Sequence, residues 1–170
     1  AILPDHVWRY FLAGSRDEVS LTESLTAWAD VRLWPHVLRD VRHPVTSTAL
    51  LGTTVPHPLG IAPTSLQRLA HPDGELAMAR AAAATGTVLV VSSNAGTPFA
   101  EIGATGATWW LQAYLTADRG LIGPTIEAAA AAGARAVVLT VDTPVPGRKY
   151  DLREGAFGDL TGVYGVNHPE

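Results

Sequence analysis

The stretch AVVLTVDTP, residues 136–144, decides how the rest of the chain is interpreted. It begins as an unbroken apolar run, which is typical of a strand buried on both faces, and it stops at a proline. Two polar side chains, Thr140 and Asp142, nevertheless stand near its end. A strand that is apolar along its length and polar at its carboxyl end is expected where a parallel sheet binds a ligand.

Three similar apolar runs precede this strand along the chain, and helical patterns separate them. The alternation of continuous apolar strands with helices predicts a parallel sheet covered by helices. The predicted strands are 59–63, 87–93 and 108–114, and the predicted helices are 71–86, a short one near 97–104, and 119–134 with a potential break at Gly123-Pro124.

Residues 1–58 lack this alternation. Helical patterns cover 4–12 and 19–31, and two short extended runs follow near 45–52 and 53–58. We interpret the whole region as an N-terminal cover of the sheet rather than as a separate domain.

All four predicted strands end on hydrogen-bonding side chains. One polar strand end would be explained by the start of a loop, but four in succession favour a shared binding site outside the carboxyl ends of the strands. These ends are Pro63-Thr64-Ser65, Ser92-Ser93-Asn94, Gln112-Ala113-Tyr114 and Thr140-Val141-Asp142.

The composition argues against several classes of protein. The net charge is −4 with scattered Lys and Arg, so no basic face for nucleic acid is expected. No stretch approaches ~18 consecutive apolar residues, so no membrane span is predicted. The chain has no cysteine, which excludes disulfides and fits a reducing compartment. Its first residues do not resemble a signal peptide, and we expect a cytoplasmic protein.

Familiar ligand motifs are also missing. The turn after 59–63 is not a GxGxxG, no GK[ST] occurs, and no His pair has helical metal-ligand spacing. No G-x-S-x-G surrounds Ser92-Ser93. The remaining neutral groups and one carboxylate suit a large, flat, polar heterocycle better than a metal or a bare phosphate, so no metal site is predicted.

The length limits the architecture. A (β/α)₈ barrel needs roughly 250 residues, whereas 59–144 supply about four βα units. Four strands would form half a barrel with unpaired edges, which must be covered. The chain is then a fragment, or a second polypeptide completes it, or it forms an independent four-stranded open sheet.

Three blocks of the sequence resemble the FMN-dependent α-hydroxy acid oxidases and dehydrogenases. They are YFLAGSRDEVSL at 10–21, IAPTSLQRLAHPDGE at 61–75 and TVDTP at 140–144. The resemblance extends from about Trp8 to Phe157.

This resemblance implies an α/β fold, a (β/α)₈ TIM barrel, with 1–170 belonging to a single, incomplete domain. Residues 1–58 would be its N-terminal cover, 59–144 its first four βα units, and 145–170 the start of an active-site loop. The other half of the barrel would come from a second chain or a C-terminal half, and the complete protein would be a homo-oligomer.

The resemblance also implies roles for individual residues around FMN at the barrel mouth. Tyr10 and Tyr114 would face the substrate, and Asp142 would orient and stabilise a catalytic histidine. The carboxylate of the substrate would be bound by Arg148 or Lys149, of which we prefer Arg148 because a planar guanidinium grips a carboxylate in two places. FMN would be contacted by Pro63, Thr64, Ser65, Ser92, Gln112 and Thr140.

The sequence departs from the family pattern in two respects. The family's base histidine, its substrate arginine and its flavin lysine belong to the second half of the barrel, so this chain alone is expected to be inactive. Asn94 stands where the family commonly has a bulky aromatic residue, so we expect an aryl or branched 2-hydroxy acid rather than glycolate.

The implied function is FMN-dependent oxidation of a 2-hydroxy acid to the 2-oxo acid. The alternative is a non-catalytic flavin-binding or scaffolding half-barrel subunit. Another FMN barrel, such as an isomerase, is less favoured because TVDTP and the N-terminal tyrosine motif point to hydroxy acid chemistry.

Overall fold

The computed structural model describes residues 2–115, 117, 119–143, 145, 147–150, 157 and 160–169. The chain divides into two compact units. Residues 1–45 and 144–158 form the N-terminal unit, and residues 46–143 and 159–170 form the sheet unit. The single-domain organisation stays a prediction, and within the predicted loop 145–170 the residues 146, 151–156, 158, 159 and 170 lie outside the described residues.

The sheet unit is built on a parallel sheet of four strands in the order β3-β4-β5-β6. Each strand therefore pairs with the next one along the chain, which confirms the predicted parallel sheet. The strands are β3 Gly60–Ile61, β4 Val88–Ser92, β5 Trp109–Tyr114 and β6 Val137–Thr140.

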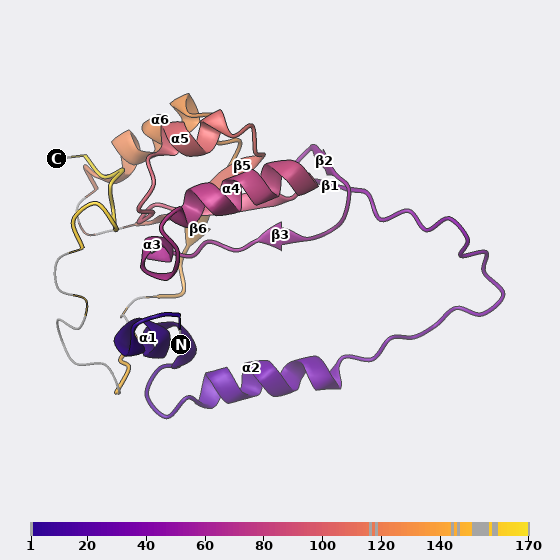
Figure 1. Ribbon diagram of the computed structural model, residues 1–170. Coiled ribbons are helices and arrows are strands. Elements are labelled where there is room, and N and C mark those ends of the chain that lie inside the picture. Colours follow the sequence, from indigo (N-terminus) through magenta and orange to yellow (C-terminus); the bar gives the residue numbers. More distant parts are fainter. Residues whose placement is uncertain are drawn as a thin grey trace. The chain divides into compact units, whose positions relative to one another are not determined.

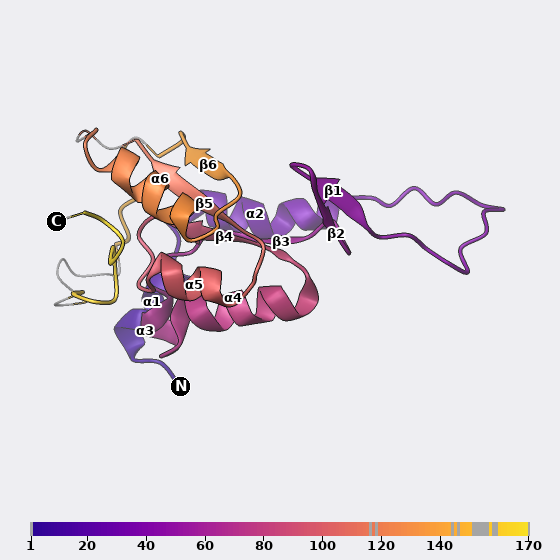
Figure 2. The same ribbon diagram turned by 90° about the horizontal axis from the view of Figure 1, so that it is seen from above.

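Three helices lie on one face of this sheet (Figures 1 and 2). They are α4 Gly74–Thr85, α5 Phe99–Ala104 and α6 Ile122–Ala131. The predicted break at Gly123-Pro124 is wrong. Pro124 stands in the first turn of α6, where a backbone N–H has no partner within the helix, so proline is tolerated there.

One further short helix, α3 Gln67–Ala70, was not predicted. It is a single turn between β3 and α4, too short to show an apolar period. It begins after Leu66, which has a left-handed backbone conformation with φ 61°.

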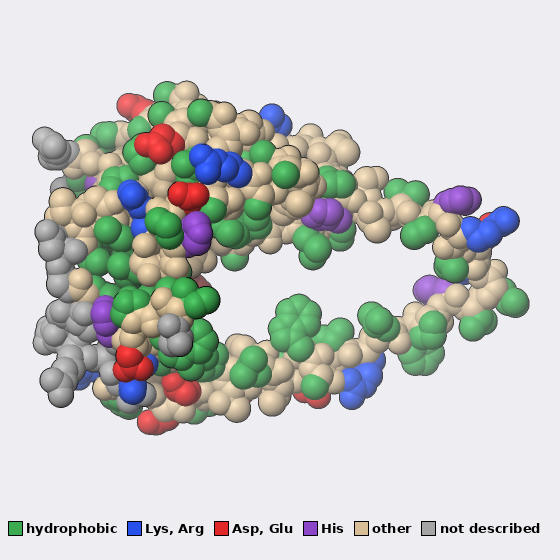
Figure 3. Space-filling model, in the orientation of Figure 1, with side chains coloured by type: hydrophobic (Ala, Val, Ile, Leu, Met, Phe, Trp, Pro, Cys, Tyr) green, Lys and Arg blue, Asp and Glu red, His purple; other side chains and the backbone are tan. Residues whose placement is uncertain are grey.

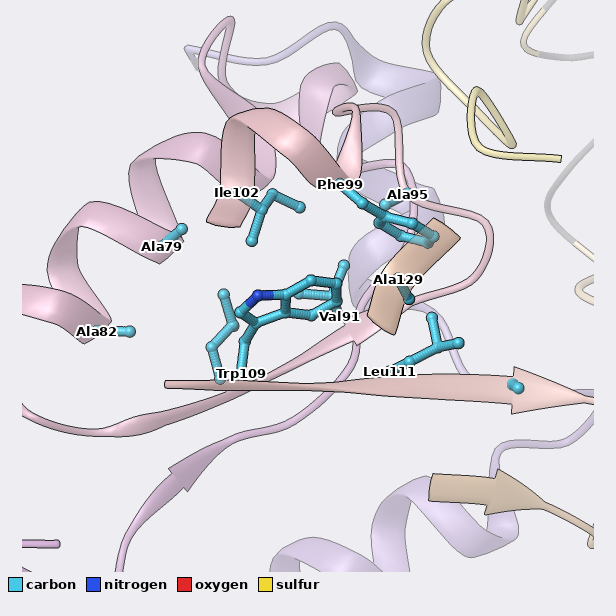
Figure 4. Close-up of a cluster of buried hydrophobic side chains, with 11 residues drawn as sticks. Ala79, Ala82, Val91, Ala95, Phe99, Ile102, Trp109, Leu111 and Ala129 are labelled. Carbon is cyan, nitrogen blue, oxygen red and sulfur yellow. The ribbon is translucent and has the colours of Figure 1, made fainter. Parts of the chain in front are cut away.

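The core of the sheet unit lies between the sheet and the helices (Figure 4). Because side chains alternate along a strand, every second residue of β4 and β5 points towards the helices. The rings of Trp109 and Phe99 pack against each other, with their centroids 5.5 Å apart. The buried cluster comprises Ala79, Ala82, Leu89, Val91, Ala95, Phe99, Ile102, Trp109, Leu111, Ala113 and Ala129.

The same alternation places the remaining strand residues on the face away from the helices. In the register of the sheet, Gln112 stands beside Val138 and Tyr114 beside Thr140. Ser92 pairs with Gln112 across β4 and β5. Ser92, Gln112, Tyr114 and Thr140 therefore share one face of the sheet near the carboxyl ends of its strands.

A hairpin precedes the sheet within the same unit. Its strands, β1 Thr48–Leu50 and β2 Thr53–Val55, are antiparallel and joined by Leu51-Gly52. Both linking residues have positive φ, 46° and 77°, which is the geometry of a two-residue turn that follows the twist of a hairpin. The extended runs predicted near 45–52 and 53–58 are confirmed.

The N-terminal unit contains α1 Asp5–Leu12 and α2 Val19–Asp30, close to their predicted bounds. In the turn between them Gly14 N donates a 2.9 Å hydrogen bond to Glu18 Oε1.

Hydrophobic side chains are exposed along α2 and the segment that follows it (Figure 3), and they include Trp28 and Trp34. None of the helices in the described ranges is long and apolar enough to cross a membrane.

Candidate functional site

Three of the predicted cofactor residues meet at the carboxyl ends of neighbouring strands. Gln112 Nε2 donates a 2.8 Å hydrogen bond to Thr140 Oγ1. Ser92 Oγ accepts one from the backbone N–H of Asn94 at 3.2 Å. Ser92 and Gln112 are both buried, so their polar groups must find partners inside the protein or on a ligand.

The predicted cofactor segment Pro63-Thr64-Ser65 begins two residues after the end of β3, at the carboxyl end of that strand. The carbonyl of Thr64 accepts a 3.0 Å hydrogen bond from Gln67 Nε2. The next residue, Leu66, has φ 61° although its side chain is buried. A left-handed conformation is costly for a leucine, and the predicted contact of Pro63-Thr64-Ser65 with a cofactor stays a prediction.

Tyr114 is the last residue of β5 and is 37% exposed. It lines a cavity of 240 Å³ at the carboxyl ends of β4 and β5, which we call the rim cavity. Ser93 and Asn94 line the same cavity. The structure thus brings Tyr114 together with the residues that follow β4.

Asp142 lies two residues beyond β6 and is exposed. Its Oδ1 accepts a 3.4 Å hydrogen bond from the hydroxyl of Thr143. Among the residues that the structure describes, no histidine contacts it, so its predicted role beside a catalytic histidine stays a prediction.

Lys149 binds the carboxyl end of helix α1. Its Nζ donates hydrogen bonds to the carbonyl oxygens of Tyr10 and Ala13, the latter at 2.6 Å, and lies 4.5 Å from the centroid of the Tyr10 ring. The last carbonyls of a helix have no partner within it, and a cation there is favourable. Burial lowers the pKa of Lys149, and the charge of Glu18 partly offsets that effect.

Arg148 is placed differently. Its carbonyl accepts hydrogen bonds from the backbone N–H of Arg16 at 2.7 Å and from Ser15 Oγ at 3.3 Å. Within the described ranges, its guanidinium makes no hydrogen bond or ion pair. Lys149 is thus bound to main-chain carbonyls, and the predicted role of Arg148 at a substrate carboxylate stays a prediction.

Tyr10 packs against aromatic neighbours within the N-terminal unit. Its ring lies edge-on to those of Phe157 and Phe11, with centroids 5.0 Å and 5.3 Å apart. Tyr10 and Tyr114 belong to different units, so their predicted convergence on one substrate stays a prediction.

The sequence patterns did not single out Glu75, which makes buried hydrogen bonds in the structure. Its carboxylate is 1% exposed, and it accepts hydrogen bonds from Gly96 N at 3.2 Å and from Thr97 Oγ1 at 2.9 Å. A signal was available, because Glu75 shares a helical face with the buried Ala79 and Ala82. An acid on an apolar helix face needs a buried partner.

The loop after β4 also carries a docked segment, residues 160–168. Gly165 N donates to the carbonyl of Asn94 at 3.2 Å, and Val166 N donates to that of Ala95 at 3.3 Å. His168 Nε2 lies 2.9 Å from Asn94 Oδ1.

Two further side chains tie this segment to the loop. Asn167 accepts a hydrogen bond from Phe99 N and donates one to the carbonyl of Thr97, both at 2.9 Å. Arg68 Nη1 bridges the carbonyls of Gly96 and Gly162 at 3.2 Å each. Sequence patterns did not predict this docking, which joins segments about 70 residues apart.

Known proteins resemble the chain over most of its length. Glycolate oxidase 3 of Arabidopsis thaliana is 40% identical over 148 residues, covering 86% of this chain and 40% of that protein. L-lactate oxidase of Nostoc sp. is 37% identical over 173 residues, covering 94% of this chain and 47% of that protein. The chain therefore spans less than half the length of these relatives.

The chain is also similar to solved structures of mandelate oxidase. A mandelate oxidase variant with (S)-mandelic acid superimposes with a TM-score of 0.91 at 32% identity, over 98% of this chain and 50% of that one. Another, with a C4a-OH-FMN adduct, gives a TM-score of 0.90 at 33% identity, over 97% of this chain and 50% of that one. The predicted fold is thereby confirmed: the chain supplies about the first four βα units of a (β/α)₈ barrel.

The family model for FMN-dependent dehydrogenases matches residues 1–161. That match covers nearly the whole chain and includes every strand of the sheet and all the predicted site residues. The chain belongs to the FMN-dependent dehydrogenase family.

Proposed function

We propose that the whole protein oxidises a 2-hydroxy acid to the corresponding 2-oxo acid with FMN as its cofactor. The observation that carries the proposal is the hydrogen bond between Gln112 and Thr140 beside Ser92, at the carboxyl ends of three neighbouring parallel strands. Ligands of (β/α)₈ barrels bind at this end of the strands.

The residues present fit FMN. The polar edge of its isoalloxazine ring carries hydrogen-bond donors and acceptors but no strong positive charge, and Ser92, Gln112 and Thr140 offer neutral groups of both kinds. Within the described ranges, no cluster of three His, Asp or Glu residues could hold a metal instead. Pro63-Thr64-Ser65 would lie along the ring from the end of β3. When bound, FMN supplies the redox chemistry by accepting a hydride.

The chain's own task is to position the substrate. The hydroxyl of Tyr114 would donate a hydrogen bond to an oxygen of the 2-hydroxy acid, and Arg148 would bind its carboxylate in two places. Holding the α-carbon of the substrate close to the flavin makes a bimolecular step effectively unimolecular, which lowers the activation barrier. Tyr10 would contribute a second hydroxyl on the substrate side.

A base is still required to take the proton of the substrate hydroxyl. Asp142 would stabilise a protonated histidine supplied by the rest of the barrel, because a neighbouring carboxylate raises the pKa of an imidazole. The chain alone would then bind part of the flavin without turning over, and the remaining residues would come from a C-terminal half or a second chain.

The test uses the full-length protein with FMN bound. We expect mandelate to bleach the flavin absorbance without oxygen, faster than glycolate does. Tyr114→Phe removes a hydroxyl but no ring contact, so it should slow flavin reduction and keep the FMN content of the wild type. Thr26, exposed on α2, provides the control: Thr26→Val also removes a hydroxyl, and its flavin should be reduced at the wild-type rate.

Two results would count against the proposal. A protein that holds FMN but is reduced by no 2-hydroxy acid would instead be a non-catalytic flavin-binding subunit. Unchanged kinetics in Tyr114→Phe would remove this hydroxyl from the site.

A further inference from the structure

Residues around Gly147, in the part of the N-terminal unit that follows β6, pack against the turn between α1 and α2. The carbonyl of Arg148 accepts hydrogen bonds from Arg16 N at 2.7 Å and from Ser15 Oγ at 3.3 Å. At Gly147 an added Cβ would stand 3.0 Å from Ser15 Oγ, so the two segments are in close contact. These contacts bring the next residue, Lys149, to the carboxyl end of α1.

The ammonium group of Lys149 contacts Tyr10 in two ways. It donates hydrogen bonds to the carbonyl oxygens of Tyr10 and, at 2.6 Å, of Ala13. It also lies 4.5 Å from the centroid of the Tyr10 ring, within the range of a cation–π interaction. An ammonium has three N–H groups, and two carbonyls and a ring face account for all of them. Lys149 therefore holds the main chain and the ring of Tyr10 at the same time.

The ring of Tyr10 also has two aromatic neighbours, both nearly perpendicular to it. Phe157 lies 5.0 Å away between centroids at an angle of 88°, and Phe11 lies 5.3 Å away at 78°. Perpendicular pairs are a favoured arrangement of aromatic rings. A ring with a cation over its face and two such neighbours has one preferred orientation. That orientation sets the direction in which the Tyr10 hydroxyl points.

We propose that Lys149 is a positioning residue, which orients Tyr10 towards the 2-hydroxy acid. This inference rests on the proposed function, which gives Tyr10 a hydroxyl on the substrate side. Lys149 acts through Tyr10 and does not bind the substrate carboxylate, because its N–H groups are already used. A compact ammonium suits this place, since it directs its N–H groups to separate acceptors, whereas a planar guanidinium suits a carboxylate.

The experiment is a double-mutant cycle in the full-length flavoprotein, with whichever of mandelate and glycolate reduces the wild-type flavin faster. Lys149→Met and Tyr10→Phe should each lower kcat/KM about tenfold, the size expected for losing one hydrogen bond to the substrate. The double variant should be no slower than Tyr10→Phe alone, because Lys149 then has no hydroxyl to orient. A side chain that bound the carboxylate directly would instead give losses that multiply.

Two further variants complete the kinetic test. Lys149→Gln keeps N–H donors for the carbonyls without the charge over the ring, so it should lose less activity than Lys149→Met. If Lys149→Met does not fold, the same cycle is carried out with Lys149→Gln. Arg42, an exposed cation of the same unit that pairs with Asp40, provides the control, and Arg42→Met should keep the wild-type kcat/KM.

A second measurement needs no turnover. The protein is labelled with 3-fluorotyrosine, and the fluorine resonance of Tyr10 is identified by its absence from Tyr10→Phe. In Lys149→Met this resonance should shift and broaden, because the ring loses the cation over its face and takes up more than one orientation. In Arg42→Met it should stay at the wild-type position.

Failure of the inference is distinct from failure of the proposed function. If the wild-type flavin is reduced but Lys149→Met keeps the wild-type kcat/KM, or the two single losses multiply in the double variant, then Lys149 does not act through Tyr10. If no 2-hydroxy acid reduces the wild-type flavin, the proposed function fails. The fluorine resonance then decides the role of Lys149: a shift supports the positioning of the Tyr10 ring, and an unchanged resonance in Lys149→Met overturns it.

Discussion

Gln112 and Thr140 are joined by a 2.8 Å hydrogen bond between neighbouring parallel strands, and the Gln112 side chain is 2% exposed. The bond fixes the orientation of the Gln112 amide, because its N–H group must point to Thr140 Oγ1. A buried amide held in one orientation can recognise a polar ring edge without reorganising, which is how a preorganised site gains affinity.

Replacing Gln112 by Leu should lower the FMN affinity of the full-length protein. The change leaves Thr140 and a polar atom of the flavin without a partner, which costs about 1–3 kcal/mol and corresponds to roughly 5- to 150-fold in the dissociation constant. Fluorescence titration of the apoprotein with FMN measures it. Glu127→Leu, at an exposed position of α6, should bind FMN like the wild type, and equal affinities in both variants would exclude Gln112 from the flavin site.

Lys149 and Arg148 should differ in what their loss affects. Lys149→Met removes hydrogen bonds from a charged group to the carbonyls of Tyr10 and Ala13, so it should lower the free energy of unfolding by about 1.5–3 kcal/mol. Arg148→Met should instead raise the KM for the 2-hydroxy acid with little loss of stability. Urea denaturation and steady-state kinetics of both variants separate the two roles, and the opposite pattern would assign the substrate carboxylate to Lys149.

Glu75 should stabilise the loop that follows β4. Glu75→Gln weakens the buried hydrogen bonds to Gly96 N and Thr97 Oγ1, and we expect a loss of about 1–3 kcal/mol in the free energy of unfolding. Glu101→Gln, at an exposed position of α5, is the control and should change stability by less than about 0.5 kcal/mol. Equal stability of the two variants in denaturant titrations would contradict this role.

Gly96 should be required for docking of residues 160–168. Gly96→Ala places a Cβ against the carbonyl of Val163, so amide hydrogens of that segment should exchange with solvent faster than in the wild type. At Gly123, in α6, an added Cβ meets nothing within 4 Å, and Gly123→Ala should stabilise the protein by about 0.5–1 kcal/mol. Unchanged exchange in Gly96→Ala would show that the loop moves aside without cost.

Residues 1–170 expressed alone should self-associate. Val137 and Leu139 of β6 are 46% and 45% exposed, and β3 and β6 are the edge strands of the sheet. Apolar side chains beside unpaired strand edges favour association with another sheet. Sedimentation velocity should therefore show oligomers, whereas a monodisperse monomer that melts cooperatively would show that the half-barrel is stable by itself.

The sequence by itself determined the order of the elements and the end of the sheet where ligands bind. Continuous apolar runs predicted β4, β5 and β6, and the helical pattern 71–86 predicted α4, because these signals depend only on neighbouring residues. The polar residues at the strand ends were visible for the same reason. In a parallel sheet all carboxyl ends lie at one edge, so their gathering followed from the fold class.

Only the tertiary structure decided which of these side chains contact one another. Gln112 meets Thr140 because of the register between β5 and β6, and Lys149 reaches the carbonyl of Tyr10 across 139 residues of chain. His168 meets Asn94 because residues 160–168 dock on the loop after β4. Such contacts depend on how distant segments are placed in space, to within the few tenths of an ångström that a hydrogen bond tolerates, and no local pattern of residues encodes that placement.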